Sequence, residues 1–136
     1  MAALRVTEPL DVVFAIDAIH DQVAPAAVLR GVHYALAPEG TFVMVDMAAA
    51  SNLEDNVANP SAPWIYSVST LHCLTVSLAG GGAGLGAAWG EQTARRMLGE
   101  AGFGEVPGAR VGAQPHLRDA PTRTRTPDRQ PFRLVG

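Results

Sequence analysis

Residues 11–47 read DVVFAIDAIHDQVAPAAVLRGVHYALAPEGTFVMVDM, and this stretch decides the fold. Its opening run, DVVFAI at residues 11–16, is continuously apolar and rich in β-branched residues, which is typical of a strand buried on both faces of a parallel sheet. Pro25 then suits the first turn of a helix. Apolar residues recur after it at helical spacing and predict an amphipathic helix of about three turns: Val28, Leu29, Val32, Ala35 and Leu36.

The helix is expected to end at residues 37–40, Ala-Pro-Glu-Gly, because this combination of Pro and Gly does not continue a helix. A second buried strand, TFVMVDM at residues 41–47, follows directly. A strand, a helix and a strand joined by short links form a βαβ unit with a right-handed crossover. The expected fold class is therefore α/β.

The next segments are less regular. Residues 64–79, WIYSVSTLHCLTVSLA, fit either a helix or a pair of strands. The glycine-rich residues 80–86 precede a helix that is predicted to run from Gly90 or Glu91 to Ala101 and to stop at Gly102. Residues 103–111 have the composition of one more strand.

The composition is that of an ordinary globular domain or part of one, with 136 residues of which 48% are apolar, 17% charged and 6% aromatic. The single cysteine, Cys73, cannot form an internal disulfide. Charged residues or prolines interrupt each apolar run before it reaches about 18 residues, and the acids Glu8 and Asp11 argue against a signal peptide. We therefore expect a cytoplasmic protein without membrane contact.

Charge is distributed unevenly along the chain, and all ten basic residues are Arg. Residues 1–109 hold four Arg and eleven acids, a net charge of -7, whereas residues 110–136 hold six Arg and two acids, a net charge of +4. From residue 109 onward the prolines are frequent and the apolar residues follow neither period. We expect residues 109–136 to form a disordered or extended tail, separate from residues 1–108.

Residues 16–47 resemble the second half of a class I S-adenosylmethionine-dependent methyltransferase. The family has an "L-x-P-G-G-x-hydrophobic" turn before its fifth strand, and Leu36 to Gly40 match it with Glu39 in place of the first Gly. Residues 51–86, together with WGEQTARRMLGEAGF at 89–103, are similar to a bacterial subgroup that methylates small molecules. The resemblance covers about residues 11–107.

The resemblance implies a partial Rossmann-like methyltransferase sheet, made of the family's fourth to sixth strands with flanking helices. The family's glycine-rich cofactor loop follows its first strand and has no counterpart here, so the chain is interpreted as the C-terminal part of a longer enzyme, truncated at the N-terminal side. Relatives continue through a hairpin to an apolar, aromatic seventh strand, and the tail offers no such sequence. The implied activity is methyl transfer from S-adenosylmethionine to oxygen or nitrogen of a small-molecule acceptor.

The implied site lies where the family's fourth strand ends. His20, followed by Asp21, matches a His-Asp pair that acts as a general base in O-methyltransferases; lining of the cofactor side and a purely structural role are the alternatives. The resemblance implies cofactor contacts by Asp17, Ala18, Ile19 and Asp21; the alternative for Asp17 is a carboxylate that caps the loop or bonds backbone amides. Asp46 ends the next strand, and it either lies near the acceptor or caps a loop.

Other features favour different functions. His72 and Cys73 are neighbours that cannot both face one metal from a strand, and no other His or Cys falls at ligand spacing, so no metal is assigned. Gly82, Gly84 and Gly86 imitate a nucleotide-binding fingerprint, an alternative to the lid region that the resemblance implies.

Two expectations concern partners. The Arg-rich tail lacks interleaved aromatic residues and the rest of the chain is acidic, so we expect no nucleic-acid partner. The predicted sheet has an exposed edge at its first strand, which favours self-association. A non-catalytic remnant or interaction module is the competing function, because half of the family's cofactor site is absent from the chain.

Overall fold

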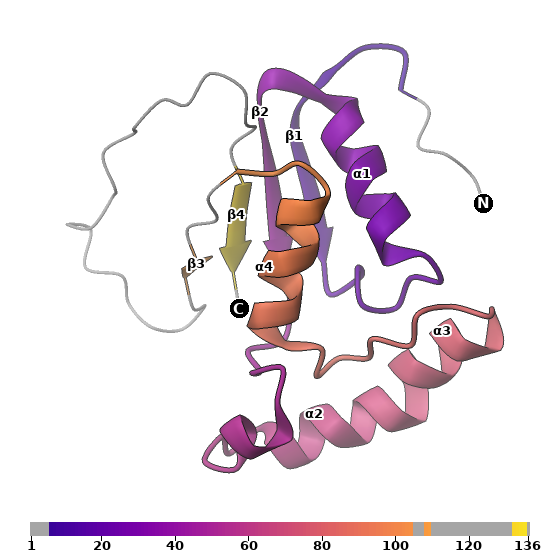
Figure 1. The fold of residues 1–136 in the computed structure, drawn as a ribbon, viewed down its shortest axis with the longest axis vertical. Coiled ribbons are helices and arrows are strands. Elements are labelled where there is room, and N and C mark those ends of the chain that lie inside the picture. Colours follow the sequence, from indigo (N-terminus) through magenta and orange to yellow (C-terminus); the bar gives the residue numbers. More distant parts are fainter. Residues whose placement is uncertain (1–5, 105–107, 110–131, 136) are drawn as a thin grey trace.

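A parallel sheet with helices against one face forms the centre of the computed structural model, which describes residues 6–104, 108–109 and 132–135 (Figure 1). The protein is thus mixed α/β. Its elements in chain order are β1 (Leu10–Ile16), α1 (Pro25–Ala35), β2 (Leu36–Val45), the 3-10 helix η1 (Leu53–Asn56), α2 (Ala62–Val68), the π-helical turn η2 (Ser69–Cys73), α3 (Leu74–Ala79), α4 (Gly90–Glu100), β3 (Gly108–Ala109) and β4 (Phe132–Val135).

The predicted strand, helix and strand are confirmed, because β1 pairs in parallel with β2 and α1 connects them. The register is interrupted once: Leu10 pairs with Leu36, whereas Val12 pairs with Thr41. The predicted turn at residues 37–40 is thus an excursion within β2. Gly40 returns the chain to β1 so closely that a Cβ atom there would lie 2.6 Å from the Leu10 carbonyl oxygen.

The tail contributes a strand that its composition did not predict. Residues Phe132–Val135 form β4, which pairs in parallel with β2 on one side and with β3 on the other, giving the order β1-β2-β4-β3. Residues 109–136 are predicted to be disordered or extended, and Phe132–Val135 are extended as a strand that is too short for its sequence to show a period. Because β3 and β4 are parallel, they do not form the hairpin that the resemblance implies. Residues 110–131 lie outside the described part.

The main core lies between one face of the sheet and the two helices α1 and α4. Val13 and Ala15 of β1 pack against a buried cluster drawn from β2, α1, α4 and the segments that flank α4. Its central members are Leu29, Val32, Phe42, Met44, Ala94, Met97, Leu98 and Phe103. The helical spacing that predicted α1 therefore identifies its buried face correctly.

The opposite face of β1 remains exposed, contrary to the prediction of a strand buried on both faces. Val12 is 49% exposed, Phe14 65% and Ile16 66%. They alternate with Val13 and Ala15 because successive side chains of a strand point to opposite faces. A continuous apolar run shows that both faces can be buried, but it does not show that a second layer is present.

Residues 62–79 are helical throughout, which resolves the ambiguity between a helix and two strands: α2, η2 and α3 follow one another without a break. This helical segment lies beyond the ends of β1 and β2 (Figure 1). A nucleotide-binding fingerprint requires a strand before its glycines, whereas α3 precedes Gly82, Gly84 and Gly86. The glycine loop instead packs on the loop after β1, where the Ala83 amide donates to the Val23 carbonyl over 3.1 Å.

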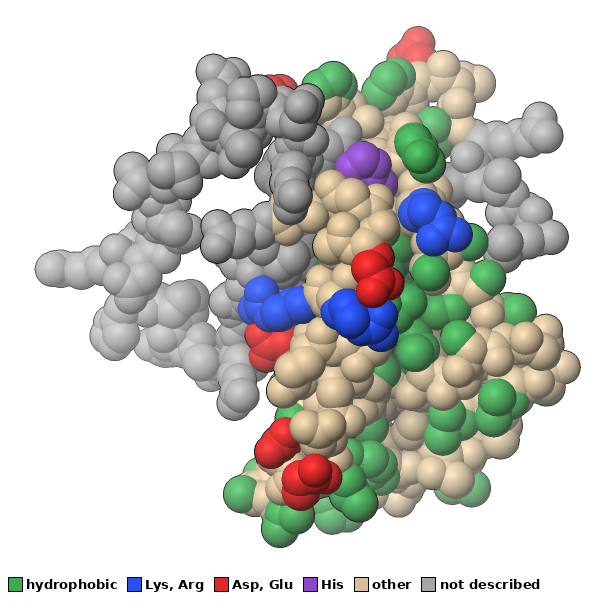
Figure 2. Space-filling model, in the orientation of Figure 1, with side chains coloured by type: hydrophobic (Ala, Val, Ile, Leu, Met, Phe, Trp, Pro, Cys, Tyr) green, Lys and Arg blue, Asp and Glu red, His purple; other side chains and the backbone are tan. Residues whose placement is uncertain are grey.

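Figure 2 shows charged side chains over α4, apolar ones over the helical segment, and both acidic and apolar ones over η1. On α4, Glu91 pairs with Arg95 at 2.7 Å and Glu100 with Arg96 at 2.8 Å. The exposed apolar residues of η1 and the helical segment include Leu53, Trp64 and Leu71. No helix among the described residues is long and apolar enough to cross a membrane.

Candidate functional site

The candidate site lies at the carboxyl ends of β1 and β2, the edge at which open α/β sheets bind ligands. Ile16 pairs with Val45 at the end of the ladder, and the Asp17 amide extends it by donating to the Val45 carbonyl over 2.8 Å. Asp17 and Asp46 follow these paired residues directly. Two parallel strands therefore deliver one carboxylate each to the same place.

His20 lies between these strand ends and is 1% exposed. Its Nδ1 atom is 2.9 Å from Oδ1 of Asp46, whose side chain is 5% exposed. An ionised carboxylate only accepts, so Nδ1 carries the proton and donates it to Asp46. The same Oδ1 accepts from the Met47 amide over 2.8 Å. Asp46 thus caps the loop after β2, as one of its two readings predicted, and also holds the His20 ring.

The other ring nitrogen of His20 faces a different pair of side chains. Nε2 lies 3.3 Å from Oδ1 of Asp21, an oxygen that is inaccessible to solvent, and the Cys73 thiol hydrogen-bonds to the same carboxylate. Cys73, at the end of η2, is buried beside it. One ligand atom each from His20, Asp21 and Cys73 lie within 4.8 Å of one another. The helical segment therefore contributes directly to the site.

The neighbouring charges alter the acidities in this cluster. Burial lowers the pKa of His20, but the hydrogen bond to Asp46 and the charges of Asp46, Asp21 and Asp17 outweigh it, so the pKa is raised above 6.5. Burial raises the pKa of Asp17, and the Asp46 and Asp21 carboxylates raise it further against the attraction of His20. Burial, with the adjacent Asp21 carboxylate, raises the pKa of the Cys73 thiol to about 11.

The remaining predicted residues differ in their access to solvent. The Asp17 side chain is 48% exposed, with Oδ1 3.9 Å from Nδ1 of His20, and its backbone has φ 50°, an unusual value for a residue other than Gly. The Ala18 carbonyl accepts from the Gln22 side chain over 2.9 Å. Ile19 is 3% exposed and belongs to the main core. Asp17 is therefore the most accessible carboxylate of the cluster, and the Ile19 side chain serves packing.

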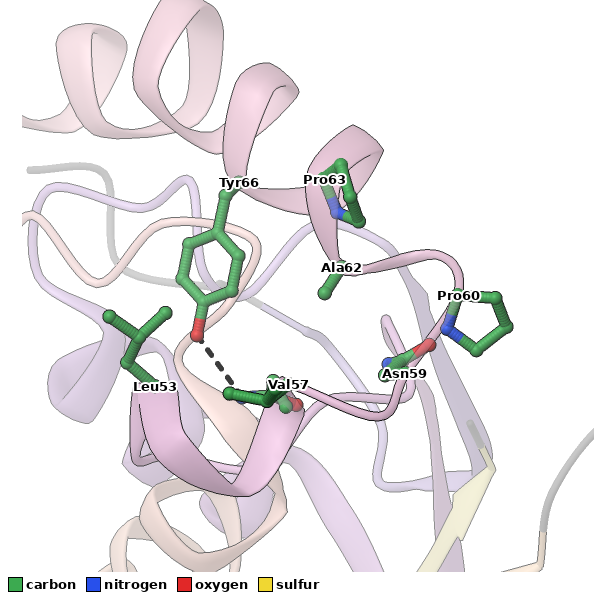
Figure 3. A pocket seen from close by; sticks show the side chains of 8 residues that line it. Leu53, Val57, Asn59, Pro60, Ala62, Pro63 and Tyr66 are labelled. Atoms are coloured by element: carbon green, nitrogen blue, oxygen red, sulfur yellow. Dashed lines mark hydrogen bonds between the residues drawn. The ribbon is translucent and has the colours of Figure 1, made fainter.

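A separate pocket of about 400 Å³ opens between η1 and the start of α2 (Figure 3). Its wall is mainly apolar, with Leu53, Pro60 and Pro63 around the Tyr66 ring. The Tyr66 hydroxyl accepts from Nδ2 of Asn56 over 3.1 Å. Asn56 also accepts from the Ala50 amide over 2.8 Å, which ties this pocket to the loop after β2.

The sequence predicts four of the five residues of this cluster as site residues, but it does not predict that Cys73 lies beside them. Three of these residues lie in the loop between β1 and α1, and one directly follows β2: Asp17, His20, Asp21 and Asp46. Cys73 lies far along the chain, in a segment whose sequence fits either a helix or two strands. The helical interpretation of that segment carries the signal that was missed: Ile65, Ser69, Cys73 and Ser77 recur at four-residue spacing and are the buried residues of the segment.

Comparison with known proteins does not identify a family for this chain. No protein-family model matches the chain, and no curated protein matches it significantly.

Proposed function

We propose that the chain carries part of an S-adenosylmethionine-dependent methyltransferase that acts on oxygen or nitrogen of a small-molecule acceptor. One observation carries the proposal: Asp17 and Asp46 converge at the ends of two parallel strands on the loop that holds His20. This is the edge of an α/β sheet where ligands bind, and it is the position at which the resemblance implies the cofactor. Asp17 and Ala18 are assigned to the methionine end of the cofactor, beside Asp21.

In this proposal His20 positions the site and does not remove a proton. Its ring is 1% exposed and each nitrogen faces a carboxylate, so an acceptor has no access to it in this arrangement. By holding Asp46 against the loop after β1, the ring fixes the ends of the two strands relative to each other. Methyl transfer then depends mainly on aligning the acceptor with the sulfonium.

Backbone amide NMR of the whole chain tests the cofactor site residue by residue. S-adenosylhomocysteine, titrated to millimolar concentration, is expected to shift the amide signals of residues 17–21 even if binding is weak. Adenosine is the matched control, because it lacks the methionine part that Asp17 and Ala18 are proposed to face. Shifts confined to residues 80–86, or none in residues 17–21, contradict the proposal.

A second candidate is an interaction module without catalytic activity, and the exposed face of β1 favours it. Parallel sheets are almost always covered on both faces, whereas Val12, Phe14 and Ile16 are exposed here. β1 is also the outermost strand of the described sheet. Self-association through this edge, without any response to S-adenosylhomocysteine, is the result that distinguishes this candidate.

A further inference from the structure

We infer that His20, Asp21 and Cys73 form a binding site for a zinc ion. The donors are Nε2 of the imidazole, Oδ1 of the carboxylate and Sγ of the thiol, from the loop after β1 and from the end of η2. A site of this composition is typical of zinc, because imidazole and thiolate favour it over magnesium or calcium. The inference goes beyond the proposed methyl transfer and does not depend on it.

The spacing of the donors fits a metal between them. Two nitrogen or oxygen ligands bound tetrahedrally to zinc at about 2.0 to 2.1 Å are about 3.3 Å apart. Nε2 of His20 and Oδ1 of Asp21 are 3.3 Å apart, and the donor atoms of the three residues lie within 4.8 Å of one another. A small contraction toward a shared ion therefore suffices.

The hydrogen bonds around His20 determine which side of the ring is free for a metal. Nδ1 donates to Asp46, so Nε2 is the nitrogen that faces Asp21 and Cys73. Zinc binding there releases the Nε2 proton of the charged ring to the solvent and uses the lone pair that this leaves. Carboxylates that hold the distal nitrogen in this way orient the ring of a metal-binding His. On the Asp46 side, Oδ1 accepts two hydrogen bonds, from His20 and from the Met47 amide, and Oδ2 is buried without a partner.

The charges within the cluster point to a bound cation. Oδ1 of Asp21 is inaccessible to solvent, and the polar groups beside this carboxylate are the His20 ring nitrogen at 3.3 Å and the Cys73 thiol, which hydrogen-bonds to it. A metal ion bound by the three side chains would take the place of the protons on these two groups. The groups whose charges act on His20 are all carboxylates: Asp46, Asp21 and Asp17. Zinc between Nε2, Oδ1 and Sγ supplies the missing positive charge; when Cys73 coordinates it, the thiol proton passes to the solvent.

Metal analysis of the whole chain tests the site. The protein is expressed with zinc in the medium, purified through a tag that binds no metal, and dialysed against a buffer free of chelators. We expect roughly one zinc per chain, and substitution by cobalt should give the near-ultraviolet absorption of a thiolate-to-cobalt bond. Magnesium should not displace zinc.

Variants separate this site from adventitious binding. Cys73→Ser and Asp21→Asn should lose most of the zinc, while Asp46→Asn, which keeps the donors but weakens the hold on His20, should reduce affinity about 10- to 100-fold. His72→Ala is the matched control, because His72 is the exposed neighbour of Cys73 and should have no effect.

Two readouts on the wild-type chain remain decisive if a variant fails to fold. Bound zinc should protect Cys73 from a thiol reagent, and a chelator should remove the protection. Wild-type protein without zinc, zinc without thiolate absorption in the cobalt form, or loss of zinc in His72→Ala alone overturns the inference. None of these readouts involves methyl transfer, so they are independent of the test of the proposed function.

Discussion

At the scale of single residues, the buried ring of His20 is the point on which the two strand ends depend. It bonds Asp46 and contacts Asp21, so its removal leaves the buried Asp46 carboxylate and the partly buried Asp21 carboxylate without this partner. Breaking a buried pair in this way costs about 3 to 5 kcal/mol. We predict that His20→Ala lowers the free energy of unfolding by about 3 kcal/mol in urea titrations.

The exposed histidine of the helical segment provides the control for that measurement. His72→Ala should change the free energy of unfolding by less than about 0.5 kcal/mol, because the side chain is exposed. If His20→Ala and His72→Ala changed the free energy of unfolding equally, the contacts of His20 would contribute no stability of their own.

Asn56 is a second buried polar residue with a structural role. It is 3% exposed; its Oδ1 accepts from the Ala50 amide and its Nδ2 donates to the Ala50 and Asn52 carbonyls. Asn56→Ala leaves these backbone groups without a partner and should cost about 2 kcal/mol or more. Asn59→Ala, which removes an exposed bond to the Ala48 carbonyl, should cost less than about 1 kcal/mol in the same urea titration.

At the scale of elements, α4 contains two glycines whose substitution by Ala should change the stability of the protein in opposite directions. Gly90 begins the helix with φ 77°, and a Cβ atom there would lie 2.2 Å from the Ser51 amide nitrogen. Gly90→Ala should therefore cost about 3 kcal/mol. Gly99, in the same helix, has no atom within 4 Å of such a Cβ, so Gly99→Ala should stabilise by about 0.5 to 1 kcal/mol.

Thermal unfolding of both glycine variants measures this contrast. A loss of stability in Gly99→Ala, or a neutral Gly90→Ala, would contradict the close approach of residues 50–51 to the start of α4.

The elements differ in how far their sequence determines them. The positions of β1, α1 and α4 follow from local periodicity and from Pro25 and Gly102, and the sequence predicts all three. The course of residues 37–40 and the existence of β4 depend on pairing with distant strands, which no local pattern records. The site also depends on residues that are distant in the sequence. His20 and Asp21 are adjacent in the chain and are predictable together, whereas the position of Cys73 beside them is not.

At the scale of the whole molecule, the exposed face of β1 has a consequence for behaviour in solution. Val12, Phe14 and Ile16 present apolar surface beside the open edge of the described sheet, an arrangement that promotes association. We predict that the mass of the wild-type protein in light scattering rises with concentration and that Phe14→Ser suppresses the rise.

Tyr34 offers a matched control on another element. It is 84% exposed on α1, so Tyr34→Ser removes an exposed aromatic ring without touching the sheet face. Association that persists in Phe14→Ser but disappears in Tyr34→Ser would place the contact on α1 instead.

The position of β4 also constrains when the sheet can assemble. Among the described strands, β3 pairs with β4 alone, and β4 separates it from β2. A chain emerging from the ribosome can form the unit of β1, α1 and β2 early, because all its parts are close in sequence. The other side of the sheet has to wait until residues 132–135 have been synthesised and released, so each new chain passes through a stage with β2 unpaired along that edge.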